Sequence, residues 1–381
     1  MKKKLVILFI ITFILLNVGP VILVKVVGFD TLLKNPELIF TVTGPVLFIY
    51  IISSIIMRMP KKREIEKQKI DPESISSEFE TRYQYLYENK LKNLERKRKL
   101  IVFLRILEAI TVVIFATGKV SLLLVLIALL YIDLRLVKGF RKDYKNDIIS
   151  SFINLINPNL RYDPNVEIEV VSAEYRKAGF DNKKFNKVYA DDNIEGFIDN
   201  STFIKMCEFE AEFRIVTETD IKIDKGLQSI LKKDKFTHTH IHEDEQIFRG
   251  IFAQSECEAN VEPCVRILKN KTKIPNENRV ELDSTEFEKY FDVYSDNKIV
   301  AIQVLTSDVM MMLLDFYNKH KIDYEILLRN RKIYIRFWVG PMFEPAIFKS
   351  SMNKKILLQY FGILKFVLDV TKGINKNLKN I

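Results

Sequence analysis

The pattern of apolar and polar positions is uneven along the chain, and four long apolar runs fall within its first 137 residues. These runs cover residues 5–24, 38–57, 100–117 and 120–137. A helix that rises about 1.5 Å per residue needs about 20 mostly apolar residues to cross a bilayer. The pattern therefore predicts four transmembrane helices, the last two forming a hairpin over residues 100–137.

Lysine and arginine residues alternate with these runs and set an orientation. Basic residues collect on the cytoplasmic side of membrane helices, where they also meet anionic lipid. The segment 58–99 is basic and has helical periodicity, which places it and both chain termini on the cytoplasmic side of the membrane. The candidate membrane-surface residues are Arg58, Lys61, Lys62, Arg63, Lys97, Arg98 and Lys99.

The third and fourth runs contain the charged residues Arg105, Glu108, Asp133 and Arg135. Charged residues inside a membrane are expected to be functional. Here all four lie toward the cytoplasmic ends of the runs, which favours anchoring and packing over an ion pathway. Arg105 and Glu108 are three residues apart, so they share one helix face and can pair. A small channel or transporter remains the alternative.

Beyond residue 146 the pattern changes to a mixture of strands and helices, and we expect a cytoplasmic α+β domain over 146–381. Interspersed strands and helices without a βαβ repeat favour this class. The expected strands are 166–170, 209–215, 247–253, 299–305, 324–328 and 332–339. The expected helices are 71–99, 306–319 and 353–378, together with a short helix before a strand in 287–294.

Composition excludes several classes of function. The net charge of +10 suits an acidic partner, but no nucleic-acid-binding motif accompanies it, so an anionic bilayer is the expected partner. The three cysteines are odd in number and predicted to be cytoplasmic, which argues against disulfides. The sequence contains no phosphate-binding glycine loop and no hydrolase motif.

The sharpest chemical cluster is His238, His240 and His242. In a strand, residues two apart point to the same side, so these imidazoles could share a zinc ion. Such a site would make the chain a membrane-tethered, metal-dependent hydrolytic enzyme. A solvated histidine-rich strand edge or loop is the favoured interpretation, so we expect no cofactor and lean against an enzyme.

Several stretches resemble one bacterial family, domain of unknown function 3137 (DUF3137), over roughly residues 76–372. The resemblance rests on residues 156–164, 178–180, 192–196, 247–252, 287–296, 305–306 and 343–345. It implies an inner-membrane protein with a cytoplasmic domain, and LemA-type membrane proteins as partners. It implies no catalytic residues.

The physical interpretation of the same stretches is structural. Asn157-Pro158-Asn159 has turn chemistry, and Gly196 and Gly250 within strand-like runs suggest bulges or close backbone approach.

Taken together, the sequence predicts an envelope-associated scaffold or accessory subunit that works by binding. Homo-oligomerisation is compatible with this function, and the sequence leaves the biological process open.

Overall fold

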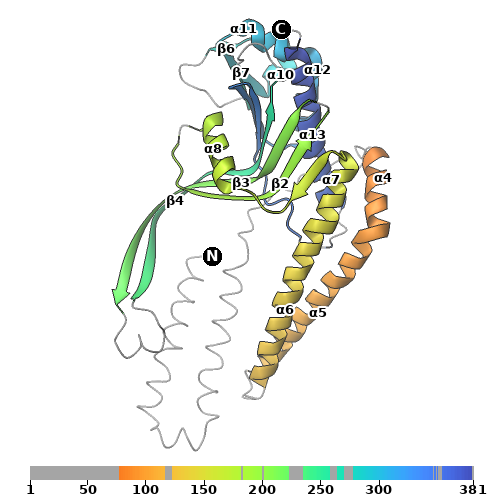
Figure 1. Ribbon diagram of the computed structural model, residues 1–381, viewed down its shortest axis with the longest axis vertical. Coiled ribbons are helices and arrows are strands. Elements are labelled where there is room, and N and C mark those ends of the chain that lie inside the picture. The colour runs from red at the N-terminus through yellow and green to blue at the C-terminus, as the bar shows by residue number, and fades with distance from the viewer. Residues whose placement is uncertain are drawn as a thin grey trace, which may run out of the picture. The chain divides into compact units, whose positions relative to one another are not determined.

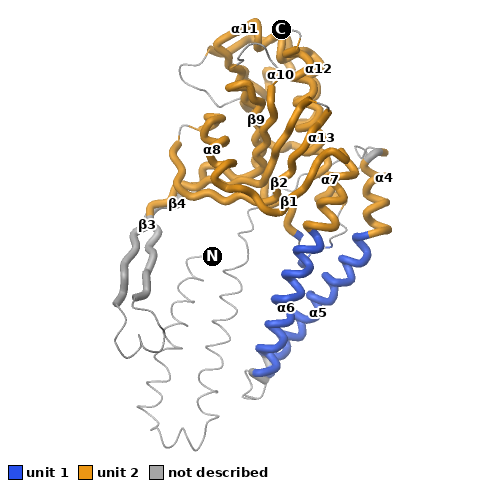
Figure 2. The backbone as a smooth tube through the Cα atoms, viewed as in Figure 1, with its two compact units in different colours: residues 1–67, 90–144, 345–352 blue, residues 68–89, 145–344, 353–381 orange. Residues whose placement is uncertain are grey.

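The computed structural model describes residues 77–115, 122–181, 183–199, 201–222, 235–257, 264–269, 278–345, 347–348, 350 and 354–379. The chain divides into two compact units (Figure 2). Unit 1 comprises residues 1–67, 90–144 and 345–352, and unit 2 comprises residues 68–89, 145–344 and 353–381. The predicted membrane runs 5–24 and 38–57 lie outside the described residues.

The described part of unit 1 is a pair of helices, α5 (Lys92–Phe115) and α6 (Leu122–Asp143), which lie side by side (Figure 1). The predicted helical hairpin is thus present. The prediction of transmembrane helices is wrong for the part of the chain that the structure describes, because no single helix there is long and apolar enough to cross a membrane. Within the described residues, only α11 (Lys298–Val304) and α12 (Ser307–His320) taken together reach the required length and apolar content. The chain bends by 66° where these two helices meet.

Charged residues are the physical reason for this correction. Every stretch of 18 residues in α5 contains Arg98, Lys99, Arg105 and Glu108, and every such stretch in α6 contains Asp133, Arg135 and Lys138. Each ionised side chain costs several kcal/mol at the centre of a bilayer. The charges therefore shorten the apolar run that either helix can offer.

Unit 2 is built on one nine-stranded sheet in which all neighbouring strands pair antiparallel, in the order β1-β2-β3-β4-β9-β8-β5-β7-β6. This confirms the α+β part of the prediction. The strands are β1 Leu160–Asp163, β2 Lys187–Phe197, β3 Phe203–Lys222, β4 Lys235–Glu256, β5 Val265–Lys269, β6 Arg279–Val280, β7 Phe291–Ser295, β8 Tyr324–Arg329 and β9 Lys332–Phe337.

The remaining helical elements belong wholly or partly to unit 2. They are α4 Ser77–Leu86, η2 Tyr87–Leu91, η3 Tyr144–Ile149, α7 Ser150–Ile156, α8 Ile168–Ala178, α10 Thr285–Glu288 and α13 Lys354–Leu378. Three of them, η3, α7 and α8, were not predicted as helices. The predicted helix 71–99 is confirmed from Ser77 onward, since α4, η2 and α5 follow one another without a break. The short helix and strand predicted in 287–294 are α10 and β7.

One face of the sheet carries an aromatic core beneath α8. Tyr175 of α8 lies with its ring 4.7 Å from Phe209 of β3 and 5.4 Å from Phe248 of β4, measured between ring centroids. Tyr334 of β9 closes the same cluster. Because side chains alternate along a strand, Glu208 and Glu210 beside Phe209 belong to the opposite face of β3.

The opposite face of the sheet is covered by α12 and α13. Phe366 of α13 contacts Phe316 of α12, with ring centroids 4.0 Å apart, and also Tyr324 and Phe337 of the sheet. Buried aromatic side chains of this size dominate core energetics. Both faces of the sheet are therefore packed, and the polar residues that remain between the layers need partners.

Two strand predictions are wrong, for the same physical reason. Residues 166–170 and 299–305 alternate like strands, yet they enter α8 and α11. Asn297 caps α11 by accepting hydrogen bonds from the amides of Ile299 and Val300. Alternation over a few residues cannot tell a short helix from a strand, and at α11 the cap decides the local structure.

Both glycines flagged in the sequence stand where another chain segment approaches. A Cβ on Gly250 would lie 1.7 Å from the carbonyl oxygen of Phe337, and a Cβ on Gly196 would lie 2.2 Å from that of Asn159. Gly196 also has φ +151°. The prediction of close backbone approach is confirmed at both positions.

Candidate functional site

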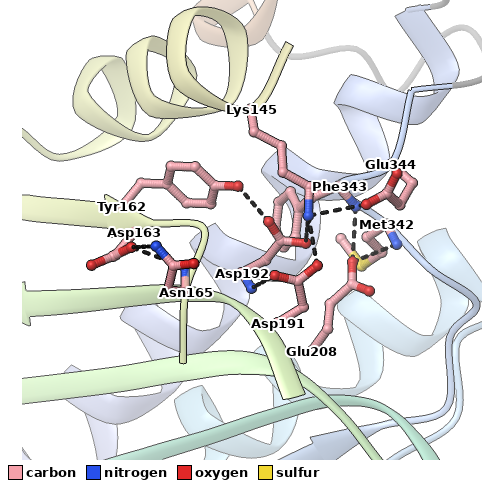
Figure 3. A network of polar contacts seen from close by, with 10 residues as sticks. All are labelled: Lys145, Tyr162, Asp163, Asn165, Asp191, Asp192, Glu208, Met342, Phe343 and Glu344. Atoms are coloured by element: carbon pink, nitrogen blue, oxygen red, sulfur yellow. Dashed lines mark hydrogen bonds and ion pairs between the residues drawn. The ribbon is translucent and has the colours of Figure 1, made fainter. Parts of the chain in front are cut away.

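The most densely charged place in unit 2 is a cluster of carboxylates around the ammonium group of Lys145, which lies in η3 (Figure 3). The Nζ atom of Lys145 is 2.7 Å from Asp191 Oδ2, 2.9 Å from Asp192 Oδ2 and 3.0 Å from Glu344 Oε1. One ammonium therefore makes three ion pairs. We call Lys145, Asp191, Asp192 and Glu344 the lysine cage.

An irregularity in β2 brings both aspartates to one point. The register between β2 and β3 shifts between Asp191 and Ile194, and Asp192 adopts a left-handed backbone with φ 59°. Bulges redirect side chains, and aspartate tolerates this backbone conformation better than most residues. Asp192 is fully buried, and the hydroxyl of Tyr162 on β1 donates a hydrogen bond to its Oδ1.

The environment shifts the pKa of Asp192, Lys145 and Tyr162. Burial raises the pKa of Asp192 to about 6, although Tyr162 and Lys145 oppose the shift. Burial alone would lower the pKa of Lys145, but its carboxylate partners outweigh this and raise it. Burial, reinforced by the charge of Asp192, also raises the pKa of Tyr162. The tyrosine thus remains a donor and the lysine remains a cation over the physiological range.

Glu208 of β3 extends the cluster toward the segment that follows β9. Its Oε1 accepts hydrogen bonds from the main-chain amides of Met342, at 2.6 Å, and Phe343, at 2.8 Å. Burial raises the pKa of Glu208 to about 7, Asp192 adds to the rise, and the two amides oppose it. The side chain of Phe343 is buried against Tyr162 and Tyr360, with ring centroids 6.4 Å and 5.0 Å away.

A cleft of about 290 Å³ borders this cluster, and Asp191 and Glu208 belong to both. Its walls come from β2, β3, β4 and the segment after β9. The lining residues are Tyr189, Ala190, Asp191, Glu208, Phe209, Glu210, Arg249, Gly250, Val339, Gly340 and Pro341. The cleft is therefore partly apolar, with three carboxylates and one guanidinium in its wall.

The oxygen atoms of Asp191, Asp192 and Glu344 lie within 4.8 Å of one another, which is a spacing that suits a metal ion. Carboxylate oxygens are good ligands for hard divalent cations. The Lys145 ammonium, however, already contacts all three carboxylates. A metal ion would have to displace a lysine whose pKa is raised, so the lysine cage fits its own ammonium better than it fits a metal.

The metal site predicted at the three histidines stays a prediction. The backbone of His238 and His240 lies in β4, opposite Thr219 and Thr217 of β3. His242 falls at a register irregularity beside Ile215. The side chains of the three histidines lie outside the part of the chain that the structure describes.

The four charged residues predicted within the membrane hairpin lie on α5 and α6. Arg105 pairs with Asp133 of the neighbouring helix, with 3.3 Å between Nε and Oδ1, rather than with Glu108 on its own helix. The guanidinium of Arg135 lies 5.3 Å from the ring centroid of Tyr131. Two of these four residues thus meet across the hairpin.

The basic residues expected at a membrane surface are partly engaged in ion pairs. Lys97 pairs with Asp143 at 2.5 Å, and Arg98 pairs with Glu95 at 2.6 Å. Lys99 is exposed. Arg58, Lys61, Lys62 and Arg63 lie outside the described residues.

Sequence analysis included two members of the lysine cage, Asp192 and Glu344, without recognising a site. Both belong, with the neighbouring Tyr162, to stretches that carry the family resemblance, and these stretches are interpreted there as turn and fold features. Lys145 was one basic residue among many, and Glu208 one of several alternating polar residues, so neither carried a signal of its own.

Comparison with known proteins gives one match. The model of the family described as a protein of unknown function, DUF3137, matches residues 246–376, which confirms the predicted resemblance over that part of the chain. No curated protein and no solved structure matches the chain. The matched segment includes Arg249 and Gly250 of the cleft and Glu344 of the lysine cage.

Proposed function

We propose that the chain is a binding protein of the bacterial envelope, a scaffold or accessory subunit that associates with the inner membrane and with membrane proteins. The single observation that carries this proposal is the surface of the α5–α6 pair. Large apolar side chains on it are open to solvent, and a basic end lies beside them. The family resemblance adds LemA-type membrane proteins as expected partners.

The apolar surface follows helical periodicity on both helices. On α5, Phe103, Ile106 and Ile110 are 61%, 56% and 50% exposed. On α6 the most exposed apolar residues are Leu124 at 76%, Ile127 at 54%, Tyr131 at 57% and Leu134 at 69%. Spacings of three, four and seven residues place each set on one side of its helix. An exposed apolar surface of this size is typical of a protein or membrane interaction site.

The basic end of the pair supports a membrane surface as the contact. The start of α5 and the end of α6 lie together, as the ion pair between Lys97 and Asp143 requires. Exposed Lys99, Lys138 and Lys142 cluster at this end. Each basic residue near an anionic leaflet contributes about 1 kcal/mol to binding. Apolar surface flanked by basic side chains suits a bilayer that contains anionic lipid.

Tryptophan fluorescence tests the proposal on the full chain. We would place a tryptophan at the exposed position Leu124 (Leu124→Trp) and, as a matched control, at Ile299 of α11, which is 69% exposed (Ile299→Trp). Vesicles carrying brominated lipid are expected to quench Leu124→Trp above the native background, and more strongly when the vesicles contain phosphatidylglycerol. Equal quenching of both variants would overturn the proposal.

A further inference from the structure

We infer that the cleft beside the lysine cage binds an alkylammonium group, supplied by a lysine side chain of a partner protein or by a free amine. The cleft lies wholly within unit 2, so this inference is independent of the α5–α6 surface.

The cleft and the lysine cage together carry an excess of negative charge. The cleft wall and the lysine cage together hold five carboxylates and two cations. The carboxylates belong to Asp191, Asp192, Glu208, Glu210 and Glu344, and the cations belong to Lys145 and Arg249. Like charges gathered around one cleft repel one another, and a cation that entered the cleft would relieve the repulsion.

Glu208 supplies the clearest open acceptor. Both amides that it accepts from, those of Met342 and Phe343, donate to Oε1. Among the described residues no hydrogen bond reaches its Oε2, and Glu208 lines the cleft. Arg249 does not neutralise Glu208, because its ion pair is with Glu210, at 3.5 Å. A carboxylate oxygen that lacks a donor and faces a cleft favours a cationic donor.

The apolar part of the wall indicates an alkyl stem on the cation. Val339 and Pro341 line the same cleft. Lysine side chains bury their methylene stems along apolar surface while the ammonium reaches polar groups. A cleft of about 290 Å³ is also roomier than a bare metal ion requires.

Tyr189 at the edge of the cleft adds an aromatic acceptor. The residue is 46% exposed, and the ammonium of Lys187 already lies 5.0 Å from the centroid of its ring. Aromatic faces attract cations through the ring quadrupole. The adjacent lysine cage gives an internal example of the same chemistry, since one alkylammonium is held there by three carboxylates at 2.7, 2.9 and 3.0 Å.

Titration calorimetry and NMR on the full chain would test this inference with three probes. The probes are Nα-acetyl-lysine N-methylamide, its Nε-acetylated neutral counterpart, and n-butylammonium. We expect the two cationic probes to bind saturably and the neutral one not to bind. Tighter binding of the lysine derivative would assign the site to a partner's side chain, and equal or tighter binding of butylammonium would assign it to a free amine.

Three variants locate the binding. Glu208→Gln keeps an acceptor for both amides, and we expect it to weaken binding about tenfold because a charge-assisted hydrogen bond is lost. Tyr189→Ala removes an exposed ring without disturbing the core, and it should weaken binding less. Glu195→Gln alters a carboxylate that pairs with Lys205, outside the cleft wall, and should leave binding unchanged.

Two outcomes would overturn the inference. One is saturable binding of the neutral counterpart with the same affinity as the cationic probes. The other is binding that stays unchanged in both Glu208→Gln and Tyr189→Ala, or is undetectable with either cationic probe.

Discussion

The Nζ atom of Lys145 lies 2.9 Å from Oδ2 of Asp192, a residue with no exposed surface. The two residues are far apart in the sequence, on η3 and β2, so their ion pair links the helical segment η3 to the sheet. Two further carboxylates share the same ammonium. Much of the electrostatics of unit 2 therefore depends on one lysine.

Replacing this lysine should be costly. In Lys145→Met the charge is lost while the stem is kept, which leaves Asp192 as a buried carboxylate without its cation. Breaking a buried ion pair in this way costs about 3–5 kcal/mol of unfolding free energy. We expect a loss of this size in urea denaturation, and a partial recovery when Asp192→Asn is added.

Lys205→Met is the matched control for that experiment, because Lys205 pairs with a single, partly exposed carboxylate at 3.5 Å. It should cost less than about 1 kcal/mol. Equal losses in Lys145→Met and Lys205→Met would contradict the structural role of the lysine cage.

Glu208 should make stability depend on pH in the direction opposite to an ordinary ion-paired carboxylate. Its folded-state pKa is raised to about 7 from an ordinary value of 4.5. The folded state therefore binds the proton more tightly, and its contribution to stability is present below pH 4.5 and lost as the pH rises through 7. Glu208→Gln should be more stable than the native chain at pH 8, and this advantage should vanish near pH 4.5. Thermal denaturation at a series of pH values would measure the difference, and an advantage that grows toward low pH would refute the assignment.

His320 should titrate with the opposite sign. Burial, with a smaller contribution from Lys319, lowers its pKa to about 4, and its Nδ1 has no hydrogen-bond partner. The unfolded chain binds the proton more tightly, so stability falls as the pH drops from 6.5 toward 4, by about 3 kcal/mol at most. His320→Leu should lose less stability over this window. Unfolding free energies of the native chain and of His320→Leu at pH 7 and pH 4.5 would test this prediction. Identical losses of stability in the two chains would show that His320 does not contribute.

Gly250 should tolerate no side chain. A Cβ there would lie 1.7 Å from the carbonyl oxygen of Phe337, on the paired strand β9, so β4 and β9 would have to separate. We expect Gly250→Ala to lower the unfolding free energy by more than about 3 kcal/mol, within the range of severe core substitutions. Gly139→Ala on α6 is the control, because nothing lies within 4 Å of its Cβ, and helix propensity predicts a gain of up to about 1 kcal/mol.

The histidine cluster carries the last prediction. We expect the purified full chain to hold no stoichiometric zinc, in line with a solvated strand edge. Metal analysis of the native chain beside a His238/His240/His242→Ala variant would test it. Stoichiometric zinc in the native chain that is lost in the variant would instead support a metal-dependent enzyme.

Local patterns predicted the local elements well where their signals were long. The alternation in 209–215 and 247–253 lies in β3 and β4, and the turn at Arg329-Asn330-Arg331 joins β8 to β9, with Asn330 and Arg331 at positive φ. The helical periodicity of residues 353–378 corresponds to α13. Short alternating stretches failed at α8 and α11, because the packing of one helical face at α8 and a cap at α11 outweighed a few alternating residues.

The sequence alone determined the helical hairpin, the α+β class and the family resemblance, because each depends on periodicity or on a local motif. The sequence-based prediction that this hairpin spans a membrane was wrong, because counting apolar residues gave too little weight to the charges of α5 and α6. Only the tertiary structure brought Lys145, Asp192, Glu208 and Glu344 together. They lie on four separate segments. The register of the sheet, the bulge in β2 and the path of the loop after β9 bring them together, and no local sequence pattern encodes these features.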